Sequence, residues 1–196
     1  MQVVVGGAVY YLVSFLDEYS RYIVHHEVVT GMDGHTVSLA AQGAIDRLAK
    51  GADDQPVAKP VIQSDNGSGY VAREFLVVLK ENGLGHHRIK PHCPEENGTM
   101  ERAYRTLREA LEGEELTNLL QARDVLARVV TWYNEQRLHS ALGYLPPAVY
   151  YRGNPAERHE ERRRKMAEAR HRRKETNLEL RQQTIPYSAE EPVAST

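Results

Sequence analysis

The chain has 196 residues, of which 41% are hydrophobic and 27% charged, so it can bury a sizeable core. No apolar stretch is long enough to cross a membrane, and residues 3–16 lack the basic start and the small-residue cleavage site of a signal peptide. The single cysteine, Cys93, excludes an internal disulfide and a Cys/His zinc site, and it predicts a cytoplasmic protein.

The net charge of −2 is unevenly distributed along the chain. Residues 1–156 contain 15 basic and 19 acidic side chains, whereas residues 157–182 contain 10 and 6. The first part is therefore −4 and the second +4. Because the overall charge does not favour nucleic acid, any DNA binding must depend on local patches.

The pattern of apolar residues predicts an antiparallel meander followed by alternating helices and strands. Residues 2–5 and 9–16 form a hairpin around Gly6-Gly7, and a third strand covers 22–29. The elements that follow are a helix over 36–49, a strand from Val61, a helix over 73–82, a strand over 86–89 and a helix that begins after Asn97. This order predicts an α/β fold with one five-stranded mixed sheet flanked by helices.

Two carboxylates stand out, Asp65 and Glu101, with 35 residues between them. Asp65 ends a short apolar strand and precedes an Asn-Gly turn, so it should project from the strand end. Glu101 lies in the first turn of an amphipathic helix, where the helix dipole favours an ionised carboxylate. Together they are candidate catalytic residues and oxygen ligands for a hard cation such as Mg²⁺. Taken singly, each is also an ordinary turn or capping residue.

The same helix carries candidate contacts to nucleic acid. Arg102, Arg105 and Arg108 recur at every third position, and solvent exposure alone explains most such arginines. Beside two metal-binding carboxylates, contact with phosphate is the better interpretation for Arg105 and Arg108. Asn97, the expected N-cap of this helix, is the third candidate contact.

The chain changes character near its C-terminal end. Residues from 154 onward are charged all round, with few apolar residues, which predicts an exposed helix or a disordered tail. We therefore expect a core domain over 1–152 and a charged tail over 153–196. The tail is either simply solvated or an arm that contacts DNA or a partner subunit.

Four motifs resemble one family. They are YYLVSFLDEYSRYIVHHEV, SDNGSGY, PEENGTMERAYRTLRE and WYNEQRLHSALGYLPPAVY, and they occur in this order between Tyr10 and Tyr151. This order is similar to that of the retroviral-type integrases and insertion-sequence transposases, the D,D-35-E recombinases. The resemblance implies a ribonuclease-H-like fold, two Mg²⁺ or Mn²⁺ ions, and cleavage and joining of DNA strands. It also implies element ends and target DNA as partners, and a homo-oligomer within a nucleoprotein complex.

The chain departs from this family at the first carboxylate, which relatives carry on the first strand. No acidic residue precedes Asp17. If the hairpin turns at Gly6-Gly7, the residue opposite Ser14 would lie two positions ahead of Met1. We interpret the first strand as incomplete, through a mis-assigned start or a decayed element. Asp17 is a poor third ligand, because its position puts it on the opposite face of the strand from Ser14. The alternative function is an inactive transposase fragment that retains only DNA or subunit binding.

Overall fold

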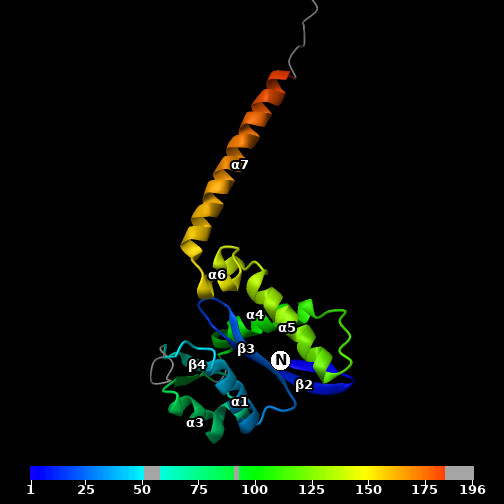
Figure 1. Cartoon of the computed structure of the whole chain (residues 1–196), viewed down its shortest axis with the longest axis vertical. Coiled ribbons are helices and arrows are strands. Elements are labelled where there is room, and N and C mark those ends of the chain that lie inside the picture. Colours follow the sequence, from blue (N-terminus) through cyan, green and yellow to red (C-terminus); the bar gives the residue numbers. More distant parts are fainter. Residues whose placement is uncertain (51–57, 91–92, 184–196) are drawn as a thin grey trace, which may run out of the picture. The chain divides into compact units, whose positions relative to one another are not determined.

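The computed structural model describes residues 1–50, 58–90 and 93–183 (Figure 1). The chain divides into two compact units, Met1–Gly153 and Asn154–Thr196. Within the described residues, none of the helices combines the length and the apolar character that crossing a membrane requires.

The first unit contains the strands and most of the helices. Its strands are β1 (Gln2–Val5), β2 (Ala8–Leu16), β3 (Ile23–Val29), β4 (Val61–Ser64) and β5 (Gly85–Arg88). Its helices are α1 (Gly34–Ile45), α2 (Ser68–Val71), α3 (Arg73–Glu81), α4 (Gly98–Ala110), α5 (Leu119–Glu135) and α6 (Pro147–Arg152), with 3₁₀ turns η1 (Pro94–Asn97) and η2 (Ser140–Leu142). The described part of the second unit is dominated by α7 (Pro155–Gln183).

The predicted hairpin between β1 and β2 is confirmed. Gly6 and Gly7 have φ angles of 55° and 83°, the left-handed conformations that a two-residue hairpin turn needs and that glycine adopts without strain. The register of the two strands runs from Gln2 opposite Tyr11 to Val5 opposite Ala8.

The single five-stranded sheet expected from the sequence is wrong. The described strands form an antiparallel sheet in the order β1-β2-β3 and a separate parallel pair, β4 and β5. The reason lies in the reach of β1, whose four residues pair with residues 8–11 of β2. One further pair of hydrogen bonds joins Met1 to Leu12. Beyond it, the end of β2 from Ser14 to Leu16 has no β1 partner, so no described strand connects it to β4.

Helices cover both faces of the three-stranded sheet, as an α/β arrangement requires (Figure 1). Side chains alternate along β2, so Leu12 joins one core and Phe15 packs against the other. The first core lies between the sheet and helices α4 and α5, and includes Val3, Val5, Leu12, Ile23, Val28, Ala103, Leu107, Ala122, Leu126, Val130 and Tyr133. The second involves α1 and α3, and includes Val37, Ala41, Ile45, Phe75, Leu79 and Leu84.

Several element ends differ from the expected ones. Helix α1 ends at Ile45 instead of extending to residue 49. The amphipathic pattern over 125–133 predicts a shorter helix than α5, which begins after Asn118, whose side chain caps it. The segment before α4 contains the short turn η1. The sequence predicts a polar loop over 51–60, and most of these residues lie outside the described part of the chain.

Candidate functional site

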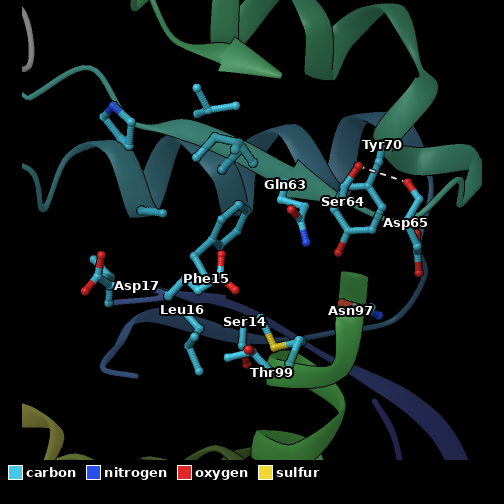
Figure 2. Close-up of a pocket in the computed structure, with 18 of the residues that line it drawn as sticks. Ser14, Phe15, Leu16, Asp17, Gln63, Ser64, Asp65, Tyr70, Asn97 and Thr99 are labelled. Carbon is cyan, nitrogen blue, oxygen red and sulfur yellow. Dashed lines mark hydrogen bonds between the residues drawn. The ribbon is translucent and has the colours of Figure 1, made fainter. Parts of the chain in front are cut away.

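A pocket of about 370 Å³ lies between the two sheets (Figure 2). Its walls include residues 14–16 of β2, residues 41–45 of α1 in part, residues 60–65 around β4, and Met100 and Tyr104 from the first half of α4. It therefore occupies the place beside β2 that β1 does not reach.

Asp65 lines this pocket directly after β4, as predicted from its position at a strand end. Its Oδ1 accepts a hydrogen bond from the Gly67 backbone N–H at 2.9 Å, and the Asn66 side chain donates to the Ile89 carbonyl at 3.0 Å. The turn is thus tied to the end of the neighbouring strand. The carboxylate is exposed, and within the described part of the chain its second oxygen makes no hydrogen bond.

Glu101 lies in the first turn of α4, as predicted, and is exposed. It does not itself line the pocket, although its neighbour Met100 and Asn97, which lies one turn earlier, both do. Asn97 occupies the expected N-cap position, yet its side chain makes no capping hydrogen bond. Residues three and four apart share a helix face, so Glu101 stands at the edge of the face that Asn97 and Tyr104 turn to the pocket.

The end of β4 and the first half of α4 lie close together, since Asp65, Met100 and Tyr104 all line the pocket. Burial raises the pKa of the Tyr104 hydroxyl, and the charge of Asp65 raises it further. Burial and Arg108 lower the pKa of the Met1 amine, whereas Asp65 raises it. The Tyr104 hydroxyl and the Met1 amine both donate to the Leu12 carbonyl, at 3.3 and 2.9 Å. Groups from β1, β2, β4 and α4 therefore meet at one place.

Asp17 lies at the other end of the pocket from Asp65 (Figure 2). Its Oδ2 accepts hydrogen bonds from the Ser20 backbone N–H, at 2.8 Å, and from the Ser20 hydroxyl. These contacts stabilise the turn between β2 and β3. No cluster of three or more His, Cys, Asp or Glu side chains suited to a metal occurs among the described residues.

The two arginine candidates are both exposed on α4. Arg105 pairs with Glu109 one turn later, with an Nε to Oε1 distance of 3.0 Å. An exposed pair of this kind is worth at most about 1 kcal/mol, so Arg105 can exchange it for a phosphate. Arg108 has no ion-pair partner in the described residues and lies near the Met1 amine.

Tyr70 and Ser14 are polar side chains of the pocket to which the sequence analysis gave no role in the site. The hydroxyl of Tyr70 points into it (Figure 2), and burial raises the pKa of this group. Ser14 is buried beside the Tyr104 hydroxyl, and among the described residues its Oγ has no hydrogen-bond partner. The signal for Tyr70 was its place just after the Asp65 turn, where an amphipathic ring can contact both core and site.

Comparison with known proteins agrees with this arrangement. Residues 1–94 and 82–147 each match a family described as an integrase core domain. Residues 1–147 belong to the integrase core family. The chain is 33% identical over 137 residues to an uncharacterized 39.2 kDa protein of insertion element IS476 from Xanthomonas euvesicatoria, covering 69% of this chain and 37% of that protein. It is also 33% identical over 139 residues to the transposase InsD of IS2 elements from Escherichia coli, covering 70% and 46%. The integrase core chain therefore spans less than half the length of these two relatives.

Solved integrase structures share the fold. The catalytic core of BIV integrase is 19% identical, with a TM-score of 0.56 over 76% of this chain and 90% of that one. The HTLV-2 integrase catalytic core, solved in complex with magnesium, is 15% identical, with a TM-score of 0.55 over 77% and 91%. The predicted ribonuclease-H-like α/β fold is confirmed at this level, apart from the division of its sheet.

Proposed function

We propose that this integrase core cleaves and joins DNA strands as part of a cytoplasmic transposase. The main support for the proposal is that Asp65, at the end of β4, and the start of α4 line the same pocket. Glu101 lies on the first turn of that helix. Its substrates are the ends of a mobile element and a target DNA, and it acts as a homo-oligomer assembled on them.

Asp65 and Glu101 are the proposed ligands of a divalent cation. Exposed carboxylates suit Mg²⁺ or Mn²⁺, which prefer oxygen ligands, and a complete enzyme of this family is expected to hold two ions. Two carboxylates do not satisfy two ions, so a further ligand has to join them. Asp17 is poorly placed for this role, because it lies at the other end of the pocket from Asp65.

Helix α4 and the residue before it are the proposed contact for the DNA backbone. Arg105 and Arg108 stand one and two turns beyond Glu101 and carry the positive charge that phosphates attract. Asn97 adds an amide at the pocket wall that no capping bond occupies. These residues would position a strand so that its phosphodiester lies next to the carboxylates.

The test uses a chain lengthened ahead of Met1 by strand residues that place an aspartate opposite Ser14. Nicking of a DNA end in Mg²⁺ or Mn²⁺ is measured for this protein and for Asp65→Asn, Glu101→Gln and Glu95→Gln. Loss of either proposed ligand removes several kcal/mol of charge stabilisation, so we expect activity to fall about 100-fold or more. Glu95 is an exposed acid in η1 with no assigned role and serves as the matched control. Equal activity in all four proteins would reject the assignment.

A further inference from the structure

The charges of α7 are sorted by side, although its composition suggests a uniformly charged helix. Successive residues of an α-helix lie about 100° apart around the axis. On this basis all the acidic residues of α7 fall within an arc of about 100°. They are Glu157, Glu160, Glu161, Glu168, Glu175 and Glu179.

Most of the basic residues occupy the opposite side. Eight of the ten project from about half of the circumference, and no acidic residue falls within that half. They are Arg158, Arg162, Arg163, Lys165, Arg170, Arg173, Lys174 and Arg181. The remaining two, Arg164 and Arg172, lie within or next to the acidic arc. We call the eight-residue surface the basic side of α7.

Ion pairs follow the boundaries between the two sides. Glu161 pairs with Lys165 at 2.7 Å and with Arg158 at 3.1 Å, and Glu160 pairs with Arg163. The Lys165 ammonium, followed by Arg158, lowers the pKa of the Glu161 carboxyl. These contacts hold the acids against the edges of the basic side.

Some basic residues at the centre of the basic side are not neutralised by acidic partners among the described residues. Within the described part of the chain, Arg170, Arg173 and Lys174 form no ion pair, and all three are exposed. Their positive charge is therefore available to a ligand that carries several negative charges in a row.

We propose that the basic side of α7 lies along the phosphate backbone of duplex DNA, an inference that rests on the proposed function for its substrate. From Arg158 to Arg181 the helix extends about 35 Å, which is close to one turn of B-DNA at about 34 Å. The acidic side faces away, where it does not repel phosphate. An anionic membrane fits less well, because the large apolar residues of α7 are few and Leu178 lies on the acidic side.

The test compares two pairs of substitutions in the full chain that remove the same charge. Arg170→Gln with Arg173→Gln alters the basic side, whereas Arg164→Gln with Arg172→Gln alters the other side. Affinity for a fluorescent duplex of arbitrary sequence is measured by anisotropy over a range of salt concentrations. Circular dichroism confirms that the helix content is unchanged.

Each phosphate contact contributes about 0.9 to the slope of log affinity against log salt. We expect Arg170→Gln with Arg173→Gln to reduce that slope by about 2. Arg164→Gln with Arg172→Gln should reduce it by less than half as much. Equal losses would show that only net charge matters, and no loss in either pair would exclude α7 from the contact. Tighter binding to anionic vesicles than to duplex, or pairing of α7 with a second copy in place of DNA, would also overturn the proposal.

Failure here differs from failure of the proposed function. Suppose that the lengthened chain does not nick DNA, but Arg170→Gln with Arg173→Gln still weakens duplex binding selectively. The role of the basic side is then supported and the catalytic assignment is rejected. If nicking depends on Asp65 and Glu101 while both pairs of substitutions bind DNA like the original, only the basic side is rejected.

Discussion

Lengthening β1 so that an aspartate faces Ser14 is expected to raise metal-dependent nicking of DNA ends by about 100-fold or more over the chain of 196 residues. In each β1–β2 pair the two residue numbers add to 13, so the partner of Ser14 is two positions ahead of Met1. Residues directly opposite in an antiparallel pair share a face, and Ser14 lines the pocket with Asp65. The added carboxylate would thus complete the ligand set.

The control places the aspartate one position nearer to Met1 in an otherwise identical extension. A shift of one residue turns the side chain to the opposite face of the sheet, so this protein should remain inactive. Nicking by the unlengthened chain at the rate of the lengthened one would show that the described residues already provide enough ligands, and the role given to this position would be wrong.

Asn134→Ala is expected to lower the free energy of unfolding by about 2–4 kcal/mol. The Asn134 side chain is 4% exposed and connects α5 to the start of β3. Its amide donates to the Ile23 carbonyl at 3.0 Å, and its oxygen accepts from the Ile23 N–H at 2.9 Å. Alanine would leave both buried backbone groups without partners, at a cost of about 1–3 kcal/mol each before relaxation.

Urea unfolding monitored by circular dichroism measures this change. Thr131→Ala is the matched control, because Thr131 is exposed on the same helix and its hydroxyl donates to the Ala127 carbonyl one turn earlier. Its effect should stay within about 0.5 kcal/mol. A loss below about 1 kcal/mol for Asn134→Ala would mean that water or backbone movement replaces the two bonds.

Local signals explain what could be predicted from the sequence. The Gly6-Gly7 turn fixes the first hairpin, and the Asn-Gly turn fixes Asp65 at a strand end, because both depend on backbone preferences of adjacent residues. The helical periodicity after Asn97 likewise places Glu101 in the first turn of α4. These features do not require knowledge of any distant contact.

Features that depend on distant partners were harder to predict. Whether β2 and β4 share a sheet depends on a strand between them. The hairpin register already indicated that β1 does not reach Ser14, but the strand pattern did not show that the sheet therefore divides. The helical spacing of Tyr104 indicates only a core residue, yet its hydroxyl donates a hydrogen bond to the Leu12 carbonyl of β2 beside the pocket. The sorted charges of α7 were overlooked because composition carries no angular information.

The central claim is that Asp65 and Glu101 hold the same divalent ion, and Mn²⁺ binding tests it most directly. Electron paramagnetic resonance of free Mn²⁺ gives the affinity of the lengthened chain and of its Asp65→Asn, Glu101→Gln and Glu95→Gln variants. We expect each of the first two to weaken binding by at least about 10-fold, since removal of even indirect ligand partners costs 10- to 100-fold, and Glu95→Gln to have no effect. Unchanged affinity in Glu101→Gln, with weakened binding only in Asp65→Asn, would contradict the shared site.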